Sequence, residues 1–148
     1  MRYWSLLKRK PDTHKGDYGH VFALAGSAGL TGAAYLTSQA AITSGSGLVT
    51  LGIPKSLNPI MARKLIEVMA RPLAETKSQS LSLKAFAEIK KFCDKIDVLA
   101  IGPGLSQNSQ TQALARKVIS KINKPMVIDA DGLNAIVGHL NLLRGQRT

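Results

Sequence analysis

The chain has 148 residues, 45% hydrophobic and 20% charged, a composition typical of one globular domain and unlike that of disordered or collagen-like chains. No apolar stretch approaches the roughly 20 residues of a membrane helix, and the basic amino terminus lacks a secretory apolar segment, so we expect a cytoplasmic protein with no membrane partner. The net charge of +11 could attract polyanions, but the basic residues are spread along the chain with few aromatics, so we predict no nucleic-acid partner.

The first half of the chain alternates short apolar runs rich in β-forming residues with segments of helical periodicity. This pattern predicts strands at 20–25, 48–53 and 66–70, and helices at 33–44 and 57–64. The helix at 33–44 is made of small residues, so it could pack close to a sheet. Glu67 makes the third strand the weakest of the three.

The second half repeats the alternation after a polar connection at 76–82. We predict a helix at 83–93 with Leu83, Phe86, Ile89 and Cys93 on its apolar face, followed by a strand at 97–101. The next helix has Leu114, Val118 and Ile122 as its buried residues, and a strand at 125–128 follows it. The apolar residues of the last predicted helix are Leu133, Ile136, Val137, Leu140 and Leu143. A strand–helix alternation of this kind indicates a parallel sheet covered by helices, in one folding unit.

The single cysteine and the three histidines give little sign of chemistry. Cys93 cannot form an internal disulfide, and on an apolar helix face we interpret it as a buried thiol rather than a nucleophile. His14, His20 and His139 have no cysteine or carboxylate at metal-ligand spacing. We therefore predict no metal cage built from these residues.

Three glycines follow the first predicted strand at intervals of three: Gly26, Gly29 and Gly32. Glycines let backbone N–H groups approach a ligand, and the helix that follows offers a positive end to a phosphate. The spacing is neither the G-x-G-x-x-G of dinucleotide-binding folds nor a P-loop. Because glycines between a strand and a helix also serve turn chemistry, the pattern alone leaves both interpretations open.

Two further loops follow strands of the second half. The segment 102–104, Gly-Pro-Gly, could be a side-chain-free rim for a flat ligand or a tight turn. Asp129 and Asp131 emerge at the end of the last strand, with Asn134 on the first turn of the next helix. Asp131 could cap that helix or face a ligand, whereas Asp129 has less structural reason to be acidic. Two ionised carboxylates this close need a donor or a cation between them.

In this order, the loops resemble the carboxy-terminal, kinase-like domain of the YjeF family, the NAD(P)H-hydrate dehydratases. The resembling segments are HKGDYGH (14–20), GSAGLTGAAYLTSQAAITSGSGLVTLGIP (26–54), AIGPGLS (100–106) and PMVIDADGLNAI (125–136). They span nearly the whole chain from residue 14 onward. We therefore predict a basic leader at 1–13 and a partial NAD(P)H-hydrate dehydratase domain at 14–148.

The resemblance implies a ribokinase-like, three-layer α/β/α fold with a mainly parallel sheet, and an ADP-dependent lyase that returns (6S)-NADHX and NADPHX to NADH and NADPH. Bacterial members use ADP and eukaryotic ones ATP; Mg²⁺ and a homo-oligomer are expected with them. Phosphorylation of the hydroxyl on the hydrated nicotinamide ring makes a leaving group that the ring nitrogen expels. Catalysis would rest on positioning and on stabilisation of the transferring phosphoryl group.

The resemblance also implies which residues contact the damaged dinucleotide. They lie in the three loops just described, and the expected substrate-binding residues are Gly29, Gly32, Ala33, Ala34, Gly102, Gly104, Asp129, Asp131 and Asn134.

The sequence departs from the family's pattern after its last predicted helix. Related proteins continue with a Thr-Pro-His-Pro-Gly-Glu-like segment, a Lys-Gly region for the nucleotide and a Gly-Thr-Gly-Asp motif with the catalytic Asp. The sequence reaches Thr148 without these motifs. We therefore expect the catalytic Asp to lie beyond Thr148, the carboxy-terminal half of the domain to be missing, and this chain alone to be inactive.

Two other functions remain open. The first is a ribokinase-like small-molecule kinase, which would share the topology, although the loop GSAGLTGAA argues against it. The second is an inactive fragment or half-domain that binds the dinucleotide or depends on a partner. Half a parallel sheet leaves an exposed strand edge, which favours association.

Overall fold

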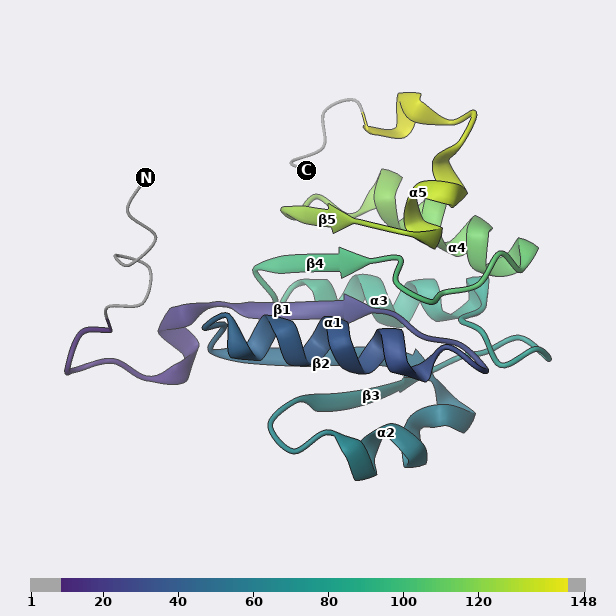
Figure 1. The fold of residues 1–148 in the computed structure, drawn as a ribbon. Helices are drawn as coiled ribbons and strands as arrows, with labels where there is room; N and C mark the ends of the chain where they lie inside the picture. Colours follow the sequence, from purple (N-terminus) through teal and green to yellow (C-terminus); the bar gives the residue numbers. More distant parts are fainter. Residues whose placement is uncertain (1–8, 144–148) are drawn as a thin grey trace.

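The computed structural model describes residues 9–143, and it contains one sheet of five strands that all run parallel (Figure 1). Their order across the sheet is β3-β2-β1-β4-β5. The strands are β1 (His20–Leu24), β2 (Leu48–Pro54), β3 (Met69–Leu73), β4 (Val98–Ile101) and β5 (Met126–Ile128). The parallel α/β architecture predicted from the sequence is confirmed.

Helices cover both faces of the sheet and make three layers, as Figure 1 shows. One face carries α1 (Thr31–Thr43) and α2 (Asn58–Lys64), which pack on alternate residues of β2 such as Val49 and Leu51. The other face carries α3 (Phe86–Cys93) and α4 (Ser109–Lys121), with α5 (Asp131–Ile136) packed against α4. Strands buried on both faces are uniformly apolar, which explains why β1 and β2 read as continuous hydrophobic runs.

Short 3₁₀ turns complete the described chain. They are η2 (Lys15–Tyr18), η3 (Lys55–Leu57), η4 (Leu83–Ala85) and η5 (Leu140–Leu143). The predicted helix at 83–93 therefore begins as a 3₁₀ turn, and Leu83 is exposed rather than part of an apolar face. Cys93 at its other end is buried, and the predicted stripe of α4 is buried as expected.

The third strand lies three residues later than predicted, at 69–73 rather than 66–70. Leu65 ends α2 in an extended conformation, and Ile66 is 94% exposed. The strand instead includes Pro72, which has no N–H for a ladder hydrogen bond. Proline is tolerated here because β3 is at the edge of the sheet.

The last predicted helix, 133–143, is wrong in its second half because α5 ends at Ile136. Val137 already leaves the helical conformation, with ψ of 126°, and Gly138 follows it with a left-handed φ of 76°. Leu133 within α5 and Val137 and Leu140 after it are exposed, while Ile136 is buried. Residues 1–8 of the predicted basic leader and the polar residues 144–148 lie outside the described part of the chain.

The strand order places a topological switch point between β1 and β4. The chain leaves β1 toward β2 and β3 on one side, and then returns to β4 and β5 on the other. In sheets of this kind, ligands bind in a crevice outside the carboxyl ends of the strands, at the switch point. The loops after β1 and β4 are the first and second loops singled out in the sequence.

Candidate functional site

The first two loops are fixed to each other at the switch point. The Gly26 N–H donates to the carbonyl of Pro103 at 2.9 Å, and the Ser27 hydroxyl donates to the carbonyl of Gly104 at 2.8 Å. Ser27 is buried. These two bonds join segments 77 residues apart in the sequence, so the loops form one wall of the crevice.

Glycines in this wall serve two different purposes. A methyl group added at Gly104 would lie 2.9 Å from Ala33 Cβ, so Gly104 lets the second loop pack tightly on α1. At Gly32, in the first turn of α1, an added Cβ would meet nothing within 4 Å. Packing among the described residues would therefore allow a side chain at position 32. A glycine at such a position is expected where a ligand approaches the backbone.

The amino end of α1 is electrostatically prepared for an anion. The residue before the helix, Leu30, makes no side-chain cap, and the first turn has no acidic residue. The N–H groups of this turn therefore keep their partial positive charge. Ala34, predicted to contact the ligand, has a fully buried side chain, whereas Ala33 is half-buried and Gly29 is exposed.

The second and third loops are joined through Asp131. One carboxylate oxygen accepts from the N–H of Ser106 at 2.9 Å, and the other accepts from the Asn134 side-chain amide at 3.1 Å. Asp131 is thus not the helix cap: it is the first residue of α5, and Ala130 precedes it without a side-chain cap. The two donors supply the compensation that two neighbouring carboxylates require.

Asp129 stays exposed at the edge of the crevice. Its main chain holds the loop, because its N–H donates to Ile101 and its carbonyl accepts from the N–H of Gly132. A Cβ added at Gly102 would come 1.7 Å from that same carbonyl, so Gly102 is required by packing. Of the predicted site residues in this loop, Asp129 and Asn134 have exposed side chains.

All of the non-glycine residues with positive φ in the described chain lie at the carboxyl edge of the sheet. They are Gln79 (53°), Ser106 (79°) and Ala130 (46°). Such conformations cost on the order of 1–3 kcal/mol each and concentrate at functional sites. These conformations were not predictable from the sequence, because alanine and glutamine carry no signal for a left-handed backbone.

The segment HKGDYGH lies at the opposite end of the strands and is structural. His14 and Asp17 form a capping box, with the His14 N–H donating to Asp17 Oδ2 at 2.8 Å. The carbonyl of Tyr18 accepts from Gly47, and the N–H of His20 donates to Asp97 Oδ2 at 2.7 Å. This part of the resemblance therefore marks the fold and not the crevice.

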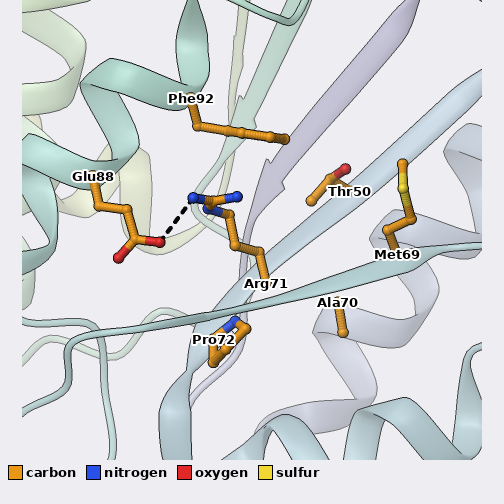
Figure 2. Close-up of a pocket in the computed structure, with 7 residues that line it drawn as sticks. All are labelled: Thr50, Met69, Ala70, Arg71, Pro72, Glu88 and Phe92. Atoms are coloured by element: carbon orange, nitrogen blue, oxygen red, sulfur yellow. Dashed lines mark ion pairs between the residues drawn. The ribbon is translucent and has the colours of Figure 1, made fainter.

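A cavity of about 400 Å³ is lined by none of the predicted site residues. Figure 2 shows the residues that line it. Thr50, Arg71, Glu88 and Phe92 line it together with Met69, Ala70 and Pro72. The guanidinium of Arg71 pairs with Glu88 at 3.0 Å and lies 4.4 Å from the centre of the Phe92 ring. The charge of Arg71 is thus paired with that of Glu88. The cavity lies between β3 and α3, away from the switch point.

Burial raises the pKa of the Cys93 thiol to about 11. The side chain is 3% exposed, so neither access nor ionisation favours a nucleophilic role. Among residues 9–143, no three His, Cys, Asp or Glu side chains come close enough to hold a metal ion. In the same range, no helix is both long and apolar enough to cross a membrane.

Together, fold and crevice define a doubly wound α/β protein of the ribokinase-like class. A ribokinase-like superfamily protein of Enterococcus faecalis superposes on 93% of the chain with a TM-score of 0.74 at 20% identity, and the match covers 47% of that protein. An ADP/ATP-dependent NAD(P)H-hydrate dehydratase of Bacillus subtilis, co-crystallised with ATP and Mg²⁺, matches 85% of the chain and 42% of its own length, with a TM-score of 0.64 and 29% identity.

The sequence model of the NAD(P)H-hydrate dehydratases matches residues 21–147, and the chain belongs to this family. A bifunctional NAD(P)H-hydrate repair enzyme of Moorella thermoacetica is 41% identical over 140 residues, which are 95% of this chain. The match covers 26% of that relative, so the chain spans about a quarter of its length.

Proposed function

We propose that this chain forms the dinucleotide-binding wall of an ADP-dependent NAD(P)H-hydrate dehydratase, which converts (6S)-NADHX and NADPHX to NADH and NADPH. The observation that supports this most is the open space over Gly32, at the amino end of α1, beside loops that hydrogen bonds of Ser27 and Asp131 hold together. In this assignment the first turn of α1 faces a phosphate, while Gly29 and Gly32 admit the backbone of the loop to the ligand.

The residues proposed to bind the substrate are those of the three loops. Gly104 and Gly102 keep the second loop close against α1 and the third loop, Ala33 lies against Gly104, and Ala34 lies against Gly26 of the first loop. Asp131 acts through Ser106 and Asn134, whereas the exposed Asp129 is the carboxylate of this set that can reach a ligand directly. Their role is to bind and orient, which favours reaction by positioning.

No cluster of three possible metal ligands occurs in residues 9–143, and none of the described residues is assigned to ADP, ATP or Mg²⁺. We therefore derive no step through a nucleotide or metal on this chain. The proposal assigns substrate binding to these loops. It also includes a cytoplasmic location and a homo-oligomeric enzyme.

Two measurements on the purified chain test this function. Titration with NADPH, followed by amide chemical shifts, should perturb Gly29, Gly32 and Gly104 before residues of the His14–His20 segment. Incubation with NADPH hydrate, ADP and Mg²⁺ should give no return of nicotinamide absorbance, because no residue of the chain matches the family's Gly-Thr-Gly-Asp motif. Shifts confined to the amino-end segment would contradict the binding assignment, and turnover would contradict the expected inactivity.

A second candidate is a half-domain that binds the dinucleotide only with a partner chain. The observation in its favour is a group of exposed apolar side chains near the β5 edge, namely Val127, Leu133, Val137 and Leu140. Such a surface is typical of a protein contact. If this candidate holds, the chain alone should sediment as a self-associated species and leave NADPH unbound, and both should change when a partner is supplied.

A further inference from the structure

The polar segment 74–82 follows β3 and lies at the same edge of the sheet as the three loops of the site. It is a tight turn closed by an antiparallel bridge between Glu75 and Leu81. The sequence predicted only a polar connection at 76–82. Instead Thr76, Ser80 and Ser82 are buried, which is unusual for hydroxyl side chains in a surface turn.

This turn touches the first glycine loop directly. The N–H of Ala28 donates to the carbonyl of Gln79 at 3.1 Å. Gln79 adopts a left-handed conformation, with φ of 53°, although it is not glycine. The surrounding contacts must therefore hold this residue in an unfavourable backbone conformation that aims its carbonyl at Ala28.

A buried hydroxyl network provides those contacts. The Ser80 hydroxyl lies 2.9 Å from the Thr76 hydroxyl and 2.8 Å from the hydroxyl of Thr111 on α4. The single proton of Thr111 can be donated to Ser80 or to the carbonyl of Leu81, also at 2.8 Å. Thr111 is 1% exposed, so these bonds form without competition from water.

The same turn reaches two other parts of the carboxyl edge. The Asn108 side-chain amide donates to the Ser78 hydroxyl at 3.2 Å, and Asn108 caps α4 directly after the second loop. The carboxylate of Glu75 accepts from both the N–H and the hydroxyl of Ser56, in the turn after β2. One short segment is thus bonded to the loops after β1, β2 and β4.

We propose that segment 74–82 is a fourth loop of the site, and that Ser80 and Thr111 are positioning residues that hold Ala28 and the first glycine loop in place for the dinucleotide. This inference rests on the proposed function. The chain of contacts runs from Thr111 through Ser80 to the backbone of Gln79, and from its carbonyl to Ala28. Loss of the buried hydroxyl on α4 releases the glycine loop, although Thr111 itself touches no ligand.

The test uses Thr111→Val, which keeps the shape of the side chain and removes its hydroxyl, on the full 148-residue chain. Hydrogen exchange of the Ala28 amide should accelerate about tenfold relative to amides of β1, because a local opening replaces a fixed contact. NADPH should bind about three- to tenfold more weakly. Thr111→Ser retains the hydroxyl and should restore both values.

Ile119→Val is the matched control, since Ile119 is fully buried in the same helix and the apolar core, and its hydrocarbon side chain cannot hydrogen-bond to the turn. It should lower the melting temperature without changing exchange at Ala28 or binding of NADPH. Ser80→Ala is the milder second variant, because Thr111 keeps Leu81 as a partner. It should accelerate exchange at Ala28 even where Thr111→Val fails to fold.

The outcomes separate this inference from the proposed function. Unchanged exchange at Ala28 in folded Thr111→Val and Ser80→Ala would overturn the positioning role, whatever NADPH does. Faster exchange in both variants, together with no NADPH binding by the unmodified chain, would retain the positioning role and contradict the proposed function. A rise in exchange of equal size in Ile119→Val would show general loosening of the fold and would also overturn the positioning role.

Discussion

Each end of the parallel sheet contains both crowded and open glycines: at the carboxyl end a Cβ added at Gly102 would lie 1.7 Å from a carbonyl oxygen, and at the amino end one added at Gly45 would meet nothing within 4 Å. At the amino end, a Cβ added at Gly47 would lie 1.6 Å from the carbonyl oxygen of Lys15. At the carboxyl end, Gly29 and Gly32 would meet nothing within 4 Å. Both ends belong to the family resemblance, so a shared motif by itself does not separate residues that hold the fold from residues that face a ligand.

The largest expected effect is a loss of stability caused by a substitution at the amino end of the sheet. Gly47→Ala forces the backbone of 15–18 to move, so we expect the free energy of unfolding to fall by about 3 kcal/mol or more. Urea denaturation followed by circular dichroism measures the change. A fall in the free energy of unfolding smaller than that of an ordinary surface substitution would mean that position 47 tolerates a side chain as well as position 32 does.

Gly32→Ala tests an open glycine of the carboxyl end in the same way. The added methyl group meets no described atom and suits a helix, so stability should rise by about 0.5 kcal/mol. NADPH binding should weaken about tenfold, because the methyl group occupies the ligand's space. Isothermal titration of both proteins is the measurement, and unchanged affinity would remove Gly32 from the binding site.

Cys93 tests how well the amino end excludes water, since α3 ends there beside Lys124 and Asp94. Its folded pKa of about 11 exceeds the ordinary value of 9.0, so the unfolded chain loses the proton first. Stability from this group is complete below pH 9 and falls as pH rises toward 11, by about 1 kcal/mol at pH 10.

Unfolding curves between pH 8 and pH 10 measure this loss, and Cys93→Ala should lack this part of the pH dependence. The folded thiol should also react slowly with an aromatic disulfide reagent at pH 8. Immediate reaction at the rate of a free thiol would show that the amino end is open.

The smallest effect concerns strain at the carboxyl end. Ala130 has φ of 46° and ψ of −118°, a region that glycine occupies more easily. Ala130→Gly should therefore stabilise the protein by about 0.5–1 kcal/mol. Ala113→Gly in the middle of α4, where the backbone is helical, is the control and should destabilise by about 1 kcal/mol. Destabilisation by both would mean that Ala130 carries no strain.

The strands and most helices were predictable because their apolar periodicity is local. The third strand was misplaced because a proline argues against a strand, and only the sheet order reveals that Pro72 lies at an edge. The last helix was overextended because its apolar spacing continued past Ile136, although the backbone leaves the helical conformation at Val137. The apolar periodicity indicated where strands and helices lie, whereas the backbone conformation of single residues determined where they end.

The candidate site was predictable in its loops and not in its connections. Gly26, Gly102 and Asp131 were visible as motif residues, but the bond from Ser106 to Asp131 spans 25 residues. The contact between Ala28 and Gln79 has no local signal, because both groups are main-chain atoms. Contacts between distant segments depend on the folded sheet, so the sequence indicated the walls of the crevice without showing how they are joined.

Pro72 affects the edge at which a further strand can pair with the sheet. Its ring nitrogen carries no hydrogen, so this residue of the edge strand supplies no donor for ladder pairing. The β3 side thus resists a sixth strand, whereas β5 ends the other side with the exposed Val127 and no proline among its three residues. Any segment or subunit that extends this sheet by strand pairing is therefore expected to do so alongside β5.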